Sequence, residues 1–383
     1  MTDATSHAPA NTGAARQTAS PEVDWIRDNA ALKAACEHWL ALPAIGVDTE
    51  FVRTRTYYAR LGLIQIGSAG RCWLIDPLPI DDWSPLAQVL GSRQTRKLIH
   101  SGSEDIEIFQ RLSETPLAGF FDTQIAAALC GLGPSLSYQA LVFELCGKEI
   151  EKDVTRSDWL ARPLSPAQIR YAALDVAHLD SLYEQLSGKL ASLGRTRWLE
   201  ADCDQLTTRV GLDDVLKTQF QRFKQVWRLN GPQRSALAGL LRWREVTARD
   251  LDRPRSHILT DNDLLALVRD LPADRESMMA LTLERSRSVG RRSKVLLDVL
   301  RTASGEQDHP PKQPEPLDRS ARTLVSQLRA AIAEQAQTLG IAPEVLCGKR
   351  DLLHLLQVGE PTAKLSGWRF DLVRPLVAEH LPT

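Results

Sequence analysis

The stretch AIGVDTEF, residues 44–51, interrupts an apolar run with two acidic side chains. The run has the composition of a buried β-strand, and side chains two positions apart on a strand point to the same face. Asp48 and Glu50 are therefore expected on one face. Neighbouring carboxylates in an apolar element are unfavourable unless a cation lies between them. A divalent metal ion is the simplest candidate, because Mg²⁺ prefers carboxylate oxygen.

The Asp-x-Glu tripeptide alone carries little information, because it occurs three times in the chain, at residues 48–50, 105–107 and 274–276. The third copy follows Leu271-Pro272 at a polar helix start, where acidic residues are favourable in the first turn. Only the first copy interrupts a strand-like run. The local pattern leaves two alternatives for it, a metal-binding pair and an ordinary polar strand end.

The composition of the 383 residues is that of a soluble globular protein with two or three domains, at 43% hydrophobic and 25% charged residues. No apolar run approaches the roughly 20 residues of a membrane helix. Residues 1–21 lack the features of a signal peptide and are expected to form a disordered tail. The six cysteines form no C-x-x-C pair. This argues against zinc and disulfides and favours a cytoplasmic location without membrane attachment.

The first half of the chain mixes strands and helices. Strands are expected at 44–52, 61–66, 71–76, 97–100 and 120–122, and helices in a leading segment 21–41 and at 83–90, 104–112, 123–131, 138–146 and 165–186. Short polar links make the first three strands a meander. The last helix has a strong start, with Ser165 at the N-cap, Pro166 and Gln168. This order indicates an α/β domain with a mixed sheet flanked by helices.

The chain beyond Arg195 has no strand signal and is expected to be helical. Helices are predicted at 212–230, 232–251, 261–269, 275–283, 288–301, 319–339, 350–357 and 366–379. Four prolines mark residues 302–318 as a linker between two helical modules. A short sequence repeat relates the two modules, because Asp263–Leu267 (DLLAL) matches Asp351–Leu355 (DLLHL).

Basic residues are locally concentrated although the net charge is only −1. Five of them fall within ten residues: Arg285, Arg287, Arg291, Arg292 and Lys294. A solvated helix face is the ordinary interpretation of such a run. The alternative is a surface that binds the phosphates of a nucleic acid.

Two further acids could meet Asp48 and Glu50. Asp105 lies in the first helical turn after the strand that ends at His100, and Asp175 lies one helical turn after Tyr171. A core tyrosine beside a solvated acid is the ordinary alternative for this last pair. Two-metal hydrolysis of a phosphodiester uses carboxylates from separate elements to hold ions about 4 Å apart. A nearby tyrosine can then orient the attacking water.

These residues form a recognisable pattern. Asp48-Thr49-Glu50, the segment HSGSED at 100–105, and Tyr171-x-x-x-Asp175 resemble the three motifs of the tyrosine branch of the DEDD exonucleases. The segments FVRTRTYY at 51–58, LGLIQ at 61–65 and SDWLARPL at 157–164 are similar to the ribonuclease D family.

The helical half resembles HRDC domains, in two copies. WRE at 243–245, DRPR at 252–255 and IL at 258–259 carry the first copy, and RDLL at 350–353 and GWR at 367–369 carry the second, looser one. The resemblance implies a ribonuclease H-like exonuclease domain at 22–205, an HRDC domain at 212–301, the proline-rich linker at 302–318 and an HRDC-like domain at 319–383.

The resemblance also implies an activity. It is that of a metal-dependent 3′–5′ exoribonuclease that releases 5′-mononucleotides and trims structured RNA, above all tRNA precursors with 3′ extensions. Two divalent ions, Mg²⁺ or Mn²⁺, would be its cofactors, and the protein is expected to be monomeric. By family analogy Asp48 would bridge both ions, and Glu50 and Asp175 would hold the ion that carries the attacking water. Asp105 would hold the other ion, and Tyr171 would position the water.

The substrate contacts are predicted less directly. Thr49 and Phe51 are candidates to touch the terminal nucleotide, with Gln65, His100 and Asp158 as secondary candidates, and the basic residues 285–294 as the main RNA footprint. Two rival functions remain open. One is a 3′–5′ DNA exonuclease, although the chain has no GxxxxGK[ST] helicase motif. The other is a catalytically dead nucleic-acid-binding module.

Overall fold

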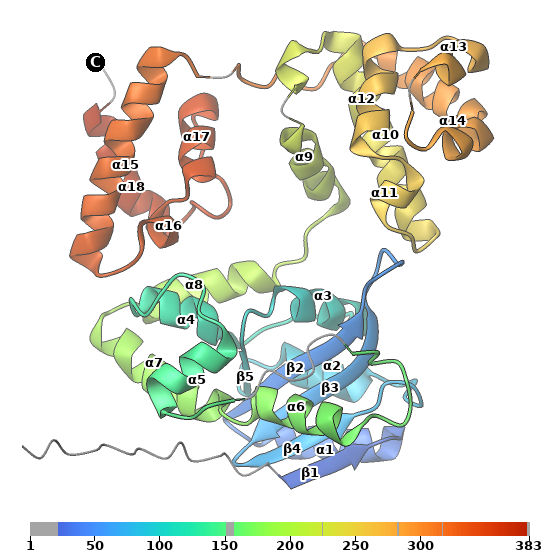
Figure 1. Ribbon diagram of the computed structural model, residues 1–383. Coiled ribbons are helices and arrows are strands. Elements are labelled where there is room, and N and C mark those ends of the chain that lie inside the picture. The colour runs from blue at the N-terminus through green and yellow to red at the C-terminus, as the bar shows by residue number, and fades with distance from the viewer. Residues whose placement is uncertain (1–21, 151–156, 224, 282, 316, 381–383) are drawn as a thin grey trace, which may run out of the picture. The chain divides into compact units, whose positions relative to one another are not determined.

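The computed structural model describes residues 22–150, 157–223, 225–281, 283–315 and 317–380 (Figure 1). The predicted disordered tail lies outside the described residues. Contacts divide the chain into two compact units, which are described separately. The first comprises the described residues of Met1–Thr49, Leu63–Phe109 and Leu117–Asp204, and the second those of Glu50–Gly62, Gln110–Pro116 and Gln205–Thr383.

A mixed sheet forms the framework of the α/β part. Its strands, in spatial order, are β1 (Glu22–Ile26), β4 (Arg71–Ile75), β3 (Arg60–Ser68), β2 (Ala44–Val52), β5 (Arg96–Ile99) and β6 (Phe120–Asp122). Strand β3 pairs antiparallel with β4, whereas β1–β4, β2–β5 and β5–β6 are parallel pairs. The neighbouring β2, β3 and β4 confirm the predicted meander, and the mixed sheet is confirmed with it.

Helices accompany this sheet. They are α1 (Asn29–Leu40), α2 (Ser84–Gly91), α3 (Ser103–Leu112), α4 (Thr123–Leu129), α5 (Tyr138–Cys146), α6 (Pro166–Val176), α7 (Leu179–Ser192) and α8 (Thr196–Thr207). Figure 1 shows α6 across the face of the strands, and α4, α5 and α7 grouped beside β5. The predicted start of α6 is confirmed, since Ser165 and Gln168 form a reciprocal capping box.

Two glycines allow the junction of α6 and α7 to approach the sheet closely. A β-carbon at Gly46 of β2 would lie 2.9 Å from Leu179 Cδ1, and one at Gly67 of β3 would lie 2.8 Å from Val176 Cβ. Any larger residue at either position would push the helices away from the strands. The end of α6 is therefore seated directly on β2 and β3.

Three sequence predictions were wrong in the first half of the chain. The leading segment contains strand β1, which was missed because it is a short edge strand that pairs with β4, distant in sequence. Helix α8 was not predicted. The single helix expected at 165–186 is broken, since α6 ends at Val176 and α7 begins at Leu179. The break coincides with a side chain inserted from α5, described below.

The second unit is built from helices. They are α9 (Leu212–Arg222), a 3₁₀ turn (Val226–Arg228), α10 (Gly231–Asp250), α11 (Arg255–Ile258), α12 (Asp261–Asp270), α13 (Arg275–Ala280), α14 (Ser286–Ser304), α15 (Arg319–Leu339), α16 (Pro343–Leu346), α17 (Lys349–Val358) and α18 (Trp368–His380). The described residues beyond Arg195 contain no strand, as predicted. The helix expected at 212–230 stops at Arg222, and the short helices α11 and α16 were not predicted. No described helix has both the length and the apolar character needed to cross a membrane.

A buried carboxylate ties together part of the second unit. Glu245 of α10 is fully buried and accepts hydrogen bonds from Arg255 Nε at 2.5 Å, Arg249 Nε at 2.8 Å and Gln219 Nε2 at 2.8 Å. Tyr57, from the segment Glu50–Gly62 of the same unit, donates to it at 2.5 Å. Burial alone would raise the pKa of Glu245, but these hydrogen bonds outweigh burial and lower it to about 2.

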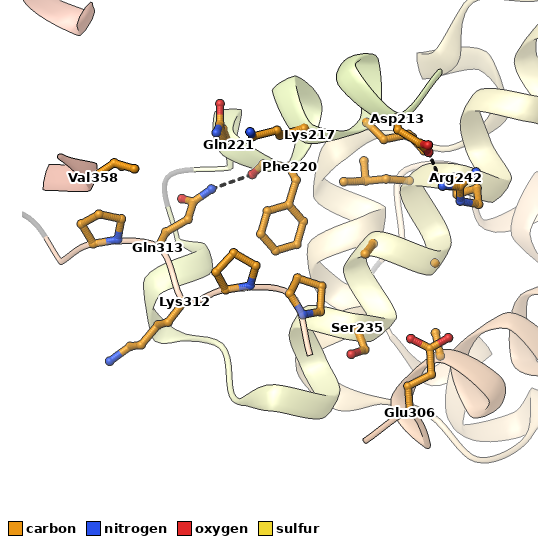
Figure 2. A pocket seen from close by; sticks show the side chains of 18 of the residues that line it. Asp213, Lys217, Phe220, Gln221, Ser235, Arg242, Glu306, Lys312, Gln313 and Val358 are labelled. Atoms are coloured by element: carbon orange, nitrogen blue, oxygen red, sulfur yellow. Dashed lines mark hydrogen bonds and ion pairs between the residues drawn. The ribbon is translucent and has the colours of Figure 1, made fainter. Parts of the chain in front are cut away.

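The proline-rich segment packs against helices of its own unit. Gln313 Nε2 donates to the carbonyl oxygen of Phe220 at 2.9 Å (Figure 2), and Arg234 Nε donates to that of Pro310 at 2.7 Å. Beside it lies a pocket of about 800 Å³, lined by residues of α9, α10, α17 and this segment. Its rim carries both signs of charge.

Candidate active site

Strand β2 and helix α6 bring three of the predicted carboxylates together. Asp48 and Glu50 occupy same-face positions of β2, and Asp175 lies in the last turn of α6. One carboxylate oxygen from each of the three residues lies within 4.8 Å of those of the other two. All three residues are half-buried. The arrangement gives three acidic ligand atoms at the spacing that one cation can share.

Asp105 lies in the first turn of α3, and it is 7% exposed. Its Oδ1 accepts a hydrogen bond from Thr49 Oγ1 at 2.5 Å. Burial raises the pKa of Asp105 to about 6, although the hydrogen bond from Thr49 acts in the opposite direction. Asp105 is not one of the three residues that converge within 4.8 Å, but its charge acts on Asp175.

Asp175 has a pKa raised further than that of Asp105. Burial, together with the charge of Asp105, raises the pKa of Asp175 to about 7. A hydrogen bond from Tyr171, one helical turn earlier, lowers this pKa but does not restore the ordinary value. Behind Tyr171 lies the indole of Trp159, which is 2% exposed, with 6.1 Å between the ring centroids. The buried ring of Trp159 thus packs against Tyr171 and supports its position beside Asp175.

The donor set fits a divalent cation. The oxygens that converge are all carboxylate oxygens, which Mg²⁺ and Mn²⁺ favour. Burial raises the pKa values of Asp105 and Asp175, and the hydrogen bonds from Thr49 and Tyr171 compensate their charged forms only in part. A cation at this position would supply that compensation.

The structure buries Gln65 fully and His100 in part. The side chain of Gln65 in β3 is fully buried, and its amide has no hydrogen-bond partner among the described residues. His100 Nδ1 lies 2.9 Å from Thr123 Oγ1, and Nε2 lies 3.1 Å from the carbonyl oxygen of Leu136. Burial lowers the pKa of His100. Substrate contact by either residue remains a prediction.

The other predicted contacts are on or near the segments that carry the acids. Phe51 follows Glu50 on β2 and is half-buried. Asp158 lies in the loop before α6, where its Oδ1 accepts a hydrogen bond from the backbone NH of Leu160 at 3.0 Å. The Thr49 hydroxyl donates to Asp105. Substrate contact by Thr49, Phe51 and Asp158 remains a prediction.

The basic cluster lies on α14 of the second unit. Arg285 is the N-cap residue, and the side chains of Arg287, Arg291 and Lys294 are exposed. Arg292 is half-buried and donates to Ser288 Oγ at 2.6 Å. Four of the five predicted residues thus remain open to solvent.

Arg162, which was not predicted as a site residue, holds the loop before α6 in place. Arg162 donates to both oxygens of Asp76, at 2.8 and 2.7 Å, and to the carbonyl oxygen of Trp159 at 2.9 Å. Trp159 is thereby held under Tyr171. The signal was present, because the segment SDWLARPL precedes Tyr171 in the sequence, but its distant partner Asp76 could not be inferred from spacing.

Comparison with known proteins agrees with this geometry. A family model described as 3′–5′ exonuclease matches residues 23–191, and one described as HRDC domain matches residues 233–300. Ribonuclease D of Pseudomonas paraeruginosa is 38% identical over 358 residues, which cover 91% of this chain and 95% of the relative. Ribonuclease D of Escherichia coli is 33% identical over 361 residues, with coverage of 91% and 95%.

The chain belongs to the ribonuclease D family.

A solved structure supports the same assignment. The crystal structure of Escherichia coli RNase D, described as an exoribonuclease involved in structured RNA processing, superposes with a TM-score of 0.85. It is 31% identical, and the match covers 94% of this chain and 98% of that one. The protein is therefore a 3′–5′ exoribonuclease with a ribonuclease D-like exonuclease fold and an HRDC domain. The use of divalent metal agrees with the exonuclease family and with the acidic cluster.

Proposed function

We propose that Asp48, Glu50, Asp105 and Asp175 hold two divalent ions, Mg²⁺ or Mn²⁺, and that the protein removes 5′-mononucleotides one at a time from the 3′ end of RNA. The observation that carries this proposal is the convergence of carboxylate oxygens from Asp48, Glu50 and Asp175 within 4.8 Å. Asp105 is the fourth ligand, because its charge acts on Asp175 from the first turn of α3.

Two divalent ions supply an activated water and compensate the charge that develops on the phosphate and on the leaving oxygen. The residues of the chain orient the reaction. Asp48 and Glu50 present their carboxylates from one face of β2, and Asp175 presents its carboxylate from α6. The Tyr171 hydroxyl, hydrogen-bonded to Asp175, positions the attacking water.

The substrate class in this proposal is structured RNA with a 3′ extension, with tRNA precursors as the main representative. Support comes from the ribonuclease D relatives and from the exposed cations of α14. Arg285, Arg287, Arg291, Arg292 and Lys294 would bind phosphates of the RNA body, independently of sequence. Thr49 and Phe51, next to Glu50 on β2, are the candidates for contact with the terminal nucleotide, and Asp158, in the loop before α6, is a secondary candidate.

The domain organisation is part of the proposal: an exonuclease domain at 22–205, an HRDC domain at 212–301, a linker at 302–318 and a second HRDC-like domain at 319–383. A local similarity supports the second copy. Asp263, in the first turn of α12, accepts a hydrogen bond from the backbone NH of Glu284 at 2.7 Å. Asp351, in the first turn of α17, accepts one from Thr362 Oγ1 at 2.6 Å. Both acids tie a helix start to a later loop.

Helices α15–α18 also have a core of their own, which is what an independent module requires. Its buried residues include Leu328, Ile332, Leu352 and Val373.

We further expect the protein to act as a monomer in the cytoplasm.

The test uses a 3′-extended tRNA and a DNA of the same sequence, each incubated with Mg²⁺, with Mn²⁺ or with EDTA. Products are resolved by length and by their terminal phosphates. The proposal expects progressive shortening of the RNA, 5′-mononucleotide products and no reaction in EDTA. Equal degradation of the DNA would contradict the choice of substrate, because it would mean that the 2′-hydroxyl is not recognised. Activity in EDTA would contradict the metal site.

A further inference from the structure

Tyr138 is inserted into the backbone between α6 and α7. It is the first residue of α5 and is 7% exposed. Its hydroxyl donates to the carbonyl oxygen of Leu174 at 3.1 Å and accepts from the backbone NH of His178, also at 3.1 Å. In an unbroken helix the NH of His178 would donate to that same carbonyl four residues earlier. The Tyr138 hydroxyl therefore takes the place of one helical hydrogen bond.

This insertion accounts for the break that the sequence did not predict. A side chain that enters the ladder of i to i−4 hydrogen bonds is a recognised cause of a sharp kink. Helix α6 ends at Val176 and α7 begins at Leu179, so the break at residues 177–178 includes the bridged NH of His178. Val176 and Leu179 then pack against Gly67 and Gly46 of the sheet.

Asp175 lies between the two residues that the hydroxyl bridges. Its position relative to β2 is thus set by the bend, since the same bend seats Val176 and Leu179 on the strands. We propose that Tyr138 is a positioning residue for the metal site, and that its hydroxyl fixes the end of α6 where the Asp175 carboxylate meets those of Asp48 and Glu50. This inference rests on the proposed function of the acidic cluster.

Two further observations place Tyr138 close to the site without making it a ligand. Burial, together with the charges of Asp175 and Asp48, raises its pKa, so the phenol keeps the proton that it donates to Leu174. Its ring packs against His100, with 5.7 Å between the ring centroids. The ring fills the core, and the hydroxyl alone bridges the backbone, so the two roles can be separated by mutation.

The experiment removes only the hydroxyl. Tyr138→Phe and wild type are titrated with Mn²⁺ in the absence of RNA, with free Mn²⁺ measured by electron paramagnetic resonance. Loss of a residue that orients a metal ligand typically weakens metal affinity by about 10- to 100-fold, and a weakening of this size is expected here. Tyr183→Phe is the matched control, because Tyr183 lies on α7 and packs edge-to-face on Phe121. It should bind Mn²⁺ like wild type.

A double variant distinguishes positioning from general loosening of the fold. If the hydroxyl acts through Asp175, then Tyr138→Phe/Asp175→Asn should bind Mn²⁺ no more weakly than Asp175→Asn alone. Additive losses would overturn the proposal, and so would wild-type affinity in Tyr138→Phe. Should Asp175→Asn itself bind Mn²⁺ like wild type, the proposed metal site would fall, which is a different outcome. Circular dichroism on each variant checks that it is folded.

Discussion

Thr49 donates its hydroxyl hydrogen to Asp105 Oδ1 across 2.5 Å, and so links strand β2 to the first turn of α3. Both side chains are buried, at 5% and 7% exposure. Thr49 lies between Asp48 and Glu50 on the strand. The hydrogen bond thus connects the residue at the centre of the acidic strand to the acid that comes from a separate helix.

Replacing Thr49 by valine removes this hydrogen bond and keeps the shape of the side chain. Because the bond lowers the pKa of Asp105, its loss should raise that pKa further and leave Asp105 less ionised near neutral pH. The Mg²⁺ concentration for half-maximal exonuclease activity should rise by about tenfold. Thr49→Ser retains the donor and should stay near wild type. An unchanged Mg²⁺ requirement in Thr49→Val would show that the bond does not serve the metal site.

Asp48→Asn tests the acidic cluster directly. It removes one of the three carboxylates that converge within 4.8 Å and keeps the size of the side chain. Activity should fall by on the order of a hundredfold or more, the scale on which loss of one preorganised electrostatic group acts. Binding of RNA in a filter assay should be retained. Glu276→Gln, an exposed acid from another Asp-x-Glu, is the control. Wild-type cleavage by Asp48→Asn would refute the site assignment.

Tyr171→Phe removes the hydroxyl that is hydrogen-bonded to Asp175. The ring should remain packed on Trp159, so the fold and the affinity for RNA should be kept. Because the hydroxyl is proposed to position the attacking water, kcat should fall by roughly a hundredfold while KM for RNA stays constant. Single-turnover cleavage at saturating Mg²⁺ measures this. A change confined to KM would instead indicate that Tyr171 binds the substrate.

The buried carboxylate of the second unit predicts a pH-dependent stability. Glu245→Gln leaves Arg249 and Arg255 without their anionic partner and should lower the free energy of unfolding by about 3 kcal/mol at pH 7. The pKa of Glu245 is about 2 in the folded protein and 4.5 in the reference state. Its stabilisation is therefore present above pH 4.5 and is lost as the pH falls to about 2.

Urea unfolding of wild type and Glu245→Gln between pH 7 and pH 3 checks this dependence. The difference between the two proteins should shrink as the pH falls below 4.5. Glu344→Gln, an exposed acid on α16, should differ from wild type by less than about 0.5 kcal/mol throughout. A difference that does not change with pH would mean that the charge of Glu245 is not what stabilises the helices.

The features that sequence reasoning located are those with local signals. Strand β2 was recognisable because two acids interrupt an apolar run, and Tyr171 and Asp175 because a spacing of four residues shares one helix face. The proposed metal site could be drawn from such patterns once a family resemblance linked the segments. Strand β1 and the break between α6 and α7 could not, because each depends on a partner distant in sequence. The partner is β4 in the first case and the Tyr138 hydroxyl in the second.

Burial was equally invisible in the sequence. Gln65 is a secondary candidate for substrate contact, and its full burial could not be inferred from the sequence, because strand alternation does not reveal that both faces of β3 are covered. Lys97 is a similar case. It is fully buried on β5, where its amine donates to the carbonyl oxygens of Ser92 and Thr95.

The exposed cations of α14 predict a salt-dependent binding of RNA. Alanine at Arg285, Arg287, Arg291 and Lys294 removes four exposed charges, while Arg292 remains in its hydrogen bond with Ser288. The backbone NH of Arg285 that donates to Asp263 is unaffected by this change. Each phosphate contact contributes about 0.7 to 0.9 to the slope of log K against log salt, so the slope should fall by roughly 3 if all four residues bind phosphate.

The measurement is the dissociation constant of a 3′-extended tRNA at several KCl concentrations, with EDTA present to stop cleavage. Lys33→Ala/Lys189→Ala, which removes two exposed lysines of the first unit, is the control for loss of charge as such. If the quadruple variant and this control change the slope equally per charge removed, the binding is a diffuse effect of net charge. A larger change per charge in the quadruple variant assigns the RNA-binding surface to α14, because only cations that contact phosphate displace condensed counterions.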